Sequence, residues 1–208
     1  LGVRRQRQMC IRDRKPLSRA IVWQDRRTSN FCQKMKEEGI EKVIKEKTGL
    51  LLDPYFSASK MKWLKDNLEL KKNSNYFVGT IDTFLISKLT EGKSFFTDIT
   101  NASRTSLFNI QECKYDEDLL KIFDLEDIQL PEVKENADFF GETKLFGGKI
   151  KICGVAGDQQ AALVGQTCFD PGLVKSTYGT GCFLMLNTGR DLVKSKNKLL
   201  TTIGYKLN

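Results

Sequence analysis

Apolar residues recur along this chain at two spacings, which predict short strands alternating with amphipathic helices. Apolar side chains three and four positions apart, with charged residues between them, predict a helix with one face packed on a core. Short apolar runs bounded by turn residues predict strands. We therefore expect helices after residue 28, around residue 43, over 60–68, 80–89 and 116–123 and from residue 158, with strands over 20–23, 95–100, 107–110 and 150–157.

The pattern changes near residues 166–172 and is missing at the N-terminus. After Pro171-Gly172 the spacing is that of strands, and residues 173–177 and 182–186 predict a β-hairpin. Residues 1–14 show neither spacing, so we interpret them as a non-native leader that lies outside the core. The expected units of the chain are 1–14, 15–168 and 169–208.

The composition is that of a globular protein, and the positive charge is confined to one end. Of the 208 residues, 40% are hydrophobic and 29% are charged, which excludes collagen-like and wholly disordered chains. The net charge is +8, but residues 1–30 carry nine basic and two acidic side chains, and the rest of the chain is nearly balanced. Such a body has no broad positive field to steer phosphate backbones, so we expect no nucleic-acid partner.

Cysteine and histidine usage restricts the compartment and the chemistry. The six cysteines are scattered, with no C-x-x-C pair, which predicts reduced, buried thiols in a cytoplasmic protein. No apolar stretch approaches the ~20 residues that span a bilayer. The chain contains no histidine, which removes Ser-His-Asp and Cys-His catalysis and most zinc sites. Carboxylates are therefore the leading general bases, and we assign no metal ligand.

The segment Gly157-Asp158-Gln159-Gln160 combines a predicted strand end, an acid and a predicted helix start. The strand would deliver Asp158 to the sheet edge where open α/β sheets bind ligands. There the carboxylate could orient and deprotonate a hydroxyl during phosphoryl transfer. Alternatively, Asp158 is only the N-cap of the helix, since Asp is a preferred capping residue. The residues alone leave both interpretations open.

The turn of the predicted hairpin, Thr177-Tyr178-Gly179-Thr180-Gly181, is a second candidate site. Gly-Thr-Gly can offer backbone N–H groups and a hydroxyl to a phosphate, but a tight turn needs the same residues without any ligand. Trp23 and Tyr55 can offer apolar walls with polar tips to a small polyol. Residues of this kind are, however, more often part of a hydrophobic core.

Six segments of the chain, in their order and their residues, closely resemble the FGGY family of carbohydrate kinases. Within that family they are most similar to the members that phosphorylate glycerol. The resemblance runs from about Lys15 to Ile203. It is carried by IVWQDRRT (21–28), DPYFS (53–57), TDITNASRT (97–105), GDQQAA (157–162), TYGTGCF (177–183) and LLTTI (199–203).

The resemblance implies an α/β chain with the actin/hexokinase-like (ribonuclease H-like) ATPase fold. The fold would be incomplete: residues 15–168 would be part of the N-terminal domain, on the glycerol side, and residues 169–208 the first strands of the C-terminal domain, on the nucleotide side. The activity implied is the ATP-dependent phosphorylation of glycerol to sn-glycerol 3-phosphate, with Mg²⁺ accompanying ATP.

The resemblance also implies roles for particular residues. Asp158 would be the general base on the glycerol hydroxyl, and Gln159 would be a hydroxyl partner. Trp23 and Phe183 would flank the carbon backbone of glycerol, and Tyr55 would hydrogen-bond a hydroxyl.

On the nucleotide side, Thr180 and Gly181 would meet the phosphates of ATP. Members of this family are more than twice as long, so we expect the fragment alone to be inactive and the full-length enzyme to be a cytoplasmic homo-oligomer. Two alternatives remain: an FGGY kinase that acts on a longer polyol or sugar, and a non-catalytic fragment with a kinase-like core.

Overall fold

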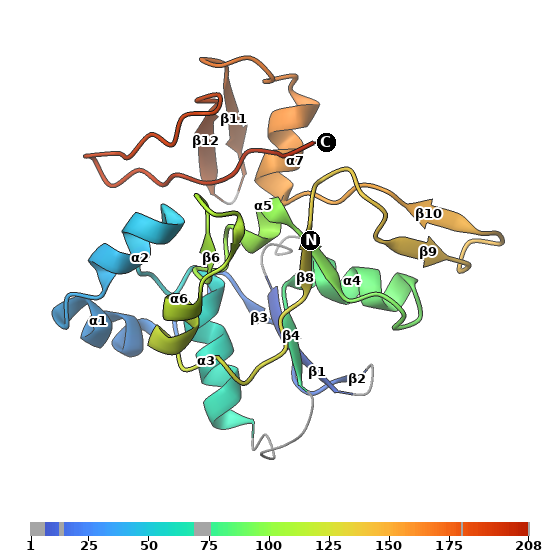
Figure 1. Cartoon of the computed structure of the whole chain (residues 1–208), viewed down its shortest axis with the longest axis horizontal. Coiled ribbons are helices and arrows are strands. Elements are labelled where there is room, and N and C mark those ends of the chain that lie inside the picture. Colours follow the sequence, from blue (N-terminus) through green and yellow to red (C-terminus); the bar gives the residue numbers. More distant parts are fainter. Residues whose placement is uncertain (1–6, 13–14, 69–75, 180, 208) are drawn as a thin grey trace.

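The computed structural model describes residues 7–12, 15–68, 76–179 and 181–207 (Figure 1). Every helix that the apolar spacing predicts is present. The helices are α1 (Ser29–Glu37), α2 (Glu41–Thr48), α3 (Ser57–Asn67), α4 (Ile81–Leu89), α5 (Ile99–Ala102), α6 (Glu117–Ile122) and α7 (Asp158–Gly165). The strands are β1 (Arg7–Arg12), β2 (Lys15–Pro16), β3 (Ile21–Val22), β4 (Phe77–Gly79), β5 (Phe96–Asp98), β6 (Phe108–Asn109), β7 (Lys114–Tyr115), β8 (Glu132–Lys134), β9 (Gly141–Thr143), β10 (Ile150–Ile152), β11 (Val174–Tyr178) and β12 (Cys182–Leu186).

A four-stranded antiparallel sheet is built around β1, which pairs with β2, β3 and β4. Ile11 is paired with Pro16 on one side and with Phe77 on the other, so β1 is an interior strand. The expectation that residues 1–14 lie outside the core is therefore wrong for residues 7–12. Strand pairing depends on backbone partners that are distant in sequence, which a local period cannot reveal. The rest of that segment lies outside the described residues.

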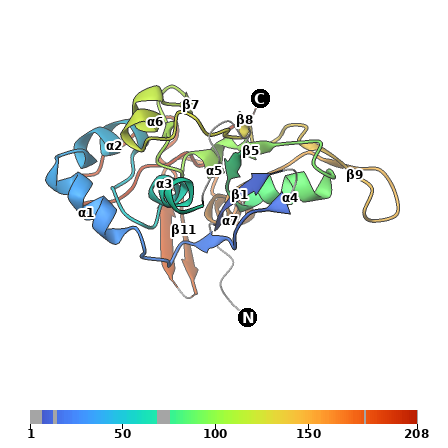
Figure 2. The same ribbon diagram turned by 90° about the horizontal axis from the view of Figure 1, so that it is seen from below.

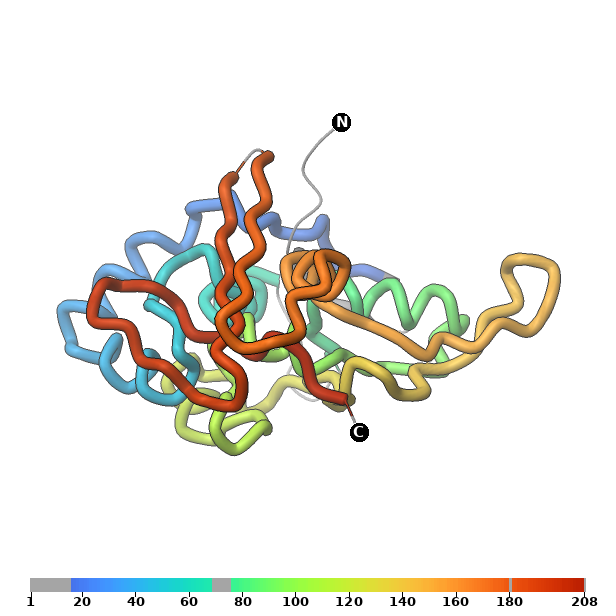
Figure 3. The backbone as a smooth tube through the Cα atoms, turned by 90° about the horizontal axis from the view of Figure 1, so that it is seen from above, coloured from blue at the N-terminus to red at the C-terminus, as the bar shows by residue number. Residues whose placement is uncertain are grey.

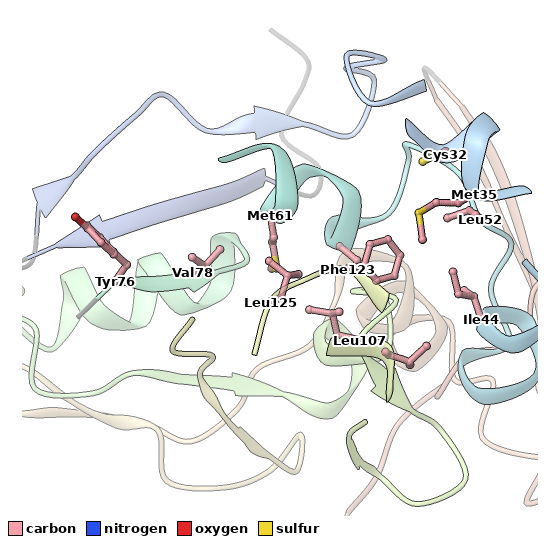
Figure 4. Packing of buried hydrophobic residues seen from close by; sticks show 12 residues of the cluster. Cys32, Met35, Ile44, Leu52, Met61, Tyr76, Val78, Leu107, Phe123 and Leu125 are labelled. Atoms are coloured by element: carbon pink, nitrogen blue, oxygen red, sulfur yellow. The ribbon is translucent and has the colours of Figure 1, made fainter. Parts of the chain in front are cut away.

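The main hydrophobic core lies among α1, α2, α3 and α6, with β4 at its edge (Figures 1, 2 and 4). Fully burying one such side chain contributes about 1.5–3 kcal/mol, so this cluster supplies a large part of the driving force for folding. Its buried members are Cys32, Met35, Ile44, Leu52, Ala58, Met61, Tyr76, Val78, Leu107, Leu119, Phe123 and Leu125. A smaller cluster beside α5 consists of Ile99, Ala102, Phe108 and Ile110, with Ile203 packed against it.

Helix ends follow the expected capping chemistry in part. α2 ends at Gly49, where φ is +71° and a Cβ would lie 2.4 Å from the backbone oxygen of Thr201, so both conformation and space require glycine. Asp116 caps α6 by accepting hydrogen bonds from backbone N–H groups of the first turn. Thr28 precedes α1 as predicted, but its hydroxyl hydrogen-bonds Ser59 Oγ at 2.9 Å in place of capping the helix. Here a contact between α1 and α3 outweighs local capping.

Two antiparallel hairpins, β9–β10 and β11–β12, project from the body (Figure 3). The second is the hairpin predicted over residues 173–186, which is thus confirmed. The strand predicted over residues 150–157 ends at Ile152, and its one partner among the described strands is β9. The expectation that a strand of an open sheet carries Asp158 to its edge is therefore wrong. Residues 153–157 instead run to α7 outside any strand.

The five described cysteines are all free. Cys32 and Cys168 are buried, whereas Cys113, Cys153 and Cys182 are exposed, so the prediction of buried thiols is wrong for these three. Apolar neighbours in sequence do not decide burial where the segment lies at the surface. Across the described part of the chain, no helix has both the length and the apolar character to cross a membrane.

Candidate active site

Trp23 and Tyr55 are far apart in sequence but lie side by side in the structure. Their ring centroids are 5.5 Å apart in an edge-to-face arrangement. Both rings are half-buried, and neither is among the buried residues of the two core clusters. That they line a substrate site stays a prediction. The guanidinium of Arg104 lies 5.9 Å from the centroid of the Tyr55 ring and 5.1 Å from that of Phe56. The result is an aromatic surface with the Arg104 guanidinium packed against two of its rings.

The loop that carries Tyr55 is held by Lys60, in the first turn of α3. Lys60 has no exposed surface, and its ammonium donates hydrogen bonds to the backbone oxygens of Pro54, of Tyr55 at 3.2 Å and of Phe56 at 3.5 Å. Burial lowers the pKa of Lys60 to about 8. α3 starts at Ser57, three residues earlier than expected, which places Lys60 within reach of these carbonyls. A charged donor thus fixes the backbone on which Tyr55 is mounted.

Asp158 is the first residue of α7, and Gly157 occupies the N-cap position. The Asp158 carboxylate is exposed and accepts a hydrogen bond from the backbone N–H of Gln159 at 2.9 Å. No side-chain cap is formed at this helix, so the alternative that Asp158 is its N-cap is wrong. A carboxylate in the first turn of a helix is stabilised in its charged form by the helix dipole.

Buried hydrogen bonds fix the backbone just before Asp158. The backbone N–H of Gly157 donates to Thr100 Oγ1 at 2.8 Å, and the Thr100 hydroxyl donates to the Asp98 carboxylate. Asn136 Nδ2 donates to Asp98 Oδ2 at 2.8 Å and to the backbone oxygen of Val155 at 2.9 Å. Because the turn is held at both 155 and 157, the start of α7 has one position relative to α5.

Two features of this network show how closely it is packed. A Cβ at Gly157 would lie 2.8 Å from Gln160 Oε1, so any larger residue there would displace the Gln160 amide. Asp98 is completely buried and also caps α5 through the backbone N–H groups of Thr100 and Asn101. Burial raises the pKa of Asp98, and its hydrogen bonds oppose that rise.

Arg104 connects the aromatic pair with the acid. Burial lowers the pKa of its guanidinium, while the Tyr55 hydroxyl and the Asp158 carboxylate act in the opposite direction. The structure shows this guanidinium in contact with the Tyr55 ring, 5.9 Å from its centroid. An accessible carboxylate near a fixed cation and an aromatic wall can accept a proton from the hydroxyl of a small polyol.

The hairpin β11–β12 adds a buried lysine next to the start of α7. Lys175, on β11, has no exposed surface. Its ammonium donates hydrogen bonds to Gln159 Oε1 and, at 3.0 Å, to Thr177 Oγ1 on the same strand. Gln159, predicted as a hydroxyl partner, is therefore tied to the hairpin as well as to Asp158.

The remaining predicted residues lie at the far end of this hairpin. Phe183 is opposite Thr177 in the strand register and half-buried. A Cβ at Gly181 would lie 3.0 Å from the Phe183 ring, so the glycine allows that ring to approach the backbone. Thr180 lies outside the described residues.

Three basic residues lie around the site that were not predicted from the sequence: Lys60, Arg104 and Lys175. Two of them lie in or next to segments that carry the family resemblance, DPYFS and TDITNASRT. For Lys175 a signal was available. In a strand, residues two apart share a face, so Lys175 lies on the same face as Thr177 and across from Met185 and Phe183. A lysine on that inward face is a candidate for a buried, functional cation.

Comparisons with known proteins agree on one family. Residues 3–165 match the model of the N-terminal domain of the FGGY family of carbohydrate kinases. The whole chain is 55% identical to a glycerol kinase of Sinorhizobium fredii and 54% identical to one of Clostridium botulinum, and it covers 44% of each. The chain therefore spans less than half the length of these curated relatives.

Solved structures show the same fold. The crystal structure of Plasmodium falciparum glycerol kinase with ADP matches with a TM-score of 0.89 and 39% identity, over 97% of this chain and 42% of that one. A xylulose kinase from Lactobacillus acidophilus matches with a TM-score of 0.76 and 23% identity, over 86% of this chain and 38% of that one. The fold is therefore the actin/hexokinase-like ATPase fold of sugar kinases, present here in part.

Proposed function

This chain belongs to the FGGY family of carbohydrate kinases, and from that premise we propose that it is the glycerol-binding portion of an ATP-dependent glycerol kinase. The full-length enzyme would convert glycerol and ATP into sn-glycerol 3-phosphate and ADP. The observation that carries the proposal is the likeness of the whole chain to glycerol kinases. The edge-to-face pair of Trp23 and Tyr55 and the exposed carboxylate of Asp158 at the start of α7 support it.

Asp158 is the proposed general base. Its carboxylate would accept the proton of a terminal glycerol hydroxyl as that oxygen forms a bond to the γ-phosphorus of ATP and the bond to ADP breaks. The hydrogen bonds of Thr100 and Asn136 support this role, because they hold the backbone ahead of Asp158 in one position. Phosphoryl transfer depends mostly on positioning and charge stabilisation, so a base on a fixed helix start suits the reaction.

Aromatic and amide side chains would bind glycerol. We propose that Trp23 and Phe183 flank its carbon backbone and that Tyr55 and Gln159 hydrogen-bond its hydroxyls. The edge-to-face pair of Trp23 and Tyr55 supports this, because it offers an apolar surface beside a polar tip. Arg104 would hold the Tyr55 ring in place from below.

Thr180 and Gly181 would meet the phosphates of ATP at the hairpin turn. A Cβ at Gly179 would have Gly181 O, at 4.0 Å, as its nearest neighbour. Successive backbone N–H groups in such a turn can bind an anion, which supports the proposal. Mg²⁺ would accompany ATP, because it binds phosphate oxygens and keeps several waters in kinase sites. Across the described residues no group of three His, Cys, Asp or Glu side chains is placed to hold a metal ion.

The division of the chain and its setting are also part of the proposal. Residues 15–168 would form the glycerol side and residues 169–208 the beginning of the nucleotide side. The free thiols of the five described cysteines support a cytoplasmic location. Self-association of the full-length enzyme is proposed from the family resemblance alone.

Substrate profiling of the full-length enzyme tests this function. With ATP present, we expect kcat/KM for glycerol to exceed that for erythritol and for xylulose by at least about tenfold, because a site built for three hydroxyls leaves polar groups unpaired with other polyols. A preference for erythritol or xylulose would assign the enzyme to a longer substrate. The absence of turnover with all three would leave the chain as a non-catalytic member of the family.

A further inference from the structure

Lys175 stands out because its charge is buried although it lies on a hairpin with several exposed apolar side chains. Its side chain has no exposed surface, whereas its strand neighbour Val174 and the next strand's Leu184 are exposed. Removing an ammonium from water costs several kcal/mol unless hydrogen bonds replace its hydration. Such a residue requires an explanation in terms of what it contacts.

The contacts of Lys175 lead to the residue beside the base. Its ammonium donates to Gln159 Oε1 and to Thr177 Oγ1. Gln159 in turn has its Nε2 at 3.4 Å from Asp158 Oδ2, and its backbone N–H donates to Asp158 Oδ1 at 2.9 Å. A continuous line of polar contacts therefore runs from the hairpin to the Asp158 carboxylate.

The chemistry of the ammonium determines which way the Gln159 amide faces. A lysine ammonium has three donors and no acceptor, whereas a glutamine amide has an acceptor end and a donor end. The amide oxygen must therefore face Lys175, which leaves the NH₂ group directed toward Asp158. A neutral partner at position 175 would permit both orientations of the amide.

We propose that Lys175 is a positioning residue that fixes the Gln159 amide as a hydrogen-bond donor next to Asp158. Gln159 then offers an N–H to the oxygen of a substrate hydroxyl while the acceptor oxygens belong to Asp158. This division of roles rests on the proposed polyol kinase function. The contact also ties the Gln159 amide to β11, which belongs to residues 169–208. The hairpin must therefore be in place for the NH₂ group of Gln159 to face the polyol site.

A double-mutant cycle in the full-length enzyme tests the proposal. The four proteins are the parent, Lys175→Met, Gln159→Ala and the double variant, with Lys149→Met as an exposed lysine control. Methionine keeps the length of the lysine side chain and is easily buried, so the fold should persist; Lys175→Gln is the second variant should it not. Residues that act as a unit give non-additive effects.

If Lys175 acts through Gln159, Lys175→Met lowers kcat/KM for glycerol by about tenfold in the parent, mainly by raising KM, and by less than threefold when Gln159 is already alanine. Lys149→Met should leave both constants unchanged. Equal losses in the two backgrounds would overturn the proposal and assign Lys175 to the nucleotide or to the fold.

Thermal unfolding of the same four proteins provides a readout that does not need turnover. We expect the shifts in thermal midpoint for Lys175→Met and Gln159→Ala to be non-additive, because both remove one contact. If the parent enzyme does not phosphorylate glycerol, the proposed function fails while this cycle still decides whether the contact exists. Additive shifts would overturn the proposal whatever the substrate.

Discussion

The helical core and the β11–β12 hairpin contain similar apolar residues, but the core buries them and the hairpin exposes several of them. Leu119 of α6 is 0% exposed within the main core, whereas Leu184 of β12 is 71% exposed. Along the exposed face of the hairpin, Val174 is paired with Leu186 and Tyr178 with Cys182, and all four side chains are exposed. The first region finds its packing partners within the chain, and the second presents an apolar face without them.

The difference extends to the site. The acid end, with Asp158, Thr100 and Asp98, is held by hydrogen bonds that are complete within the described residues. The end proposed to meet the phosphates is a hairpin turn at the tip of two projecting strands. We infer that one half of a two-part site is assembled here and that the other half needs further chain, which agrees with the 44% of the relatives' length that this chain covers.

The largest expected effect is the complete loss of activity in the chain by itself. ATP must be held from both sides for phosphoryl transfer. Among the described strands, β11 and β12 pair only with each other, and an isolated hairpin is marginally stable in water. We therefore expect no glycerol-dependent ADP formation from the purified 208-residue chain. A coupled ADP assay with the full-length enzyme as positive control measures this. Turnover by the chain alone would mean that the nucleotide half is not required.

Matched leucine truncations sharpen the comparison of the two regions. In the chain alone, Leu119→Ala should lower the free energy of unfolding by about 2–5 kcal/mol, because it leaves a cavity in a packed core. Leu184→Ala should change it by less than ~0.5 kcal/mol, because the side chain is exposed. Denaturant unfolding gives both values. In the full-length enzyme Leu184→Ala should become costly; a negligible cost there would mean that the exposed face of the hairpin stays uncovered.

Asp82, a buried acid on α4, should make the free energy of unfolding depend on pH. Burial raises the pKa of Asp82 to about 6, despite hydrogen bonds from Thr80 and Thr97. Because the folded protein holds the proton of Asp82 more tightly than the unfolded chain, the protonated acid contributes its full share to the free energy of unfolding below pH ~3.9. This contribution is lost as pH rises through about 6.

The variant Asp82→Asn cannot ionise and tests this directly. We expect it to be more stable than the parent by up to about 3 kcal/mol at pH 7, with the gap closing toward pH 4. Urea unfolding at pH 4, 5.5 and 7 measures the gap. A difference that does not change with pH would show that Asp82 does not ionise over this range in the folded protein.

The smallest effect concerns the link between α5 and the turn before Asp158. Thr100→Val keeps the shape of the side chain but removes the hydroxyl that accepts from Gly157 and donates to Asp98. We expect a loss of roughly 1–2 kcal/mol in stability and a several-fold lower kcat in the full-length enzyme. Thr100→Ser retains the hydroxyl and is the control. Equal kcat values for the two variants would show that this hydrogen bond does not determine where Asp158 is placed for the reaction.

Local patterns were sufficient for the elements and for part of the site. The helix after Thr28, the helix that ends at Gly49 and the hairpin over 173–186 follow from apolar spacing and turn residues, which act over a few positions. The start of a helix at Asp158 could be predicted for the same reason.

Contacts between distant segments were not predictable from local patterns. β1 pairs with three strands although residues 7–12 carry no period of their own, and Thr28 bonds Ser59 in place of its own helix. The basic residues around the site were missed because burial of Lys60, Arg104 or Lys175 depends on which segment covers it. The single sequence places Lys60 in a helix, Lys175 in a strand and Arg104 in the connection between two predicted strands, without specifying what covers them.

The measurement that tests the central claim most directly is kcat of Asp158→Asn in the full-length enzyme, taken together with its thermal midpoint. Asparagine keeps the size of the side chain but cannot accept the hydroxyl proton, and loss of a general base commonly costs ~10²–10⁴-fold in rate. The account predicts an unchanged midpoint, retained glycerol binding and a rate at least a hundredfold lower. A rate within threefold of the parent would contradict it, because another group would then have to take the proton.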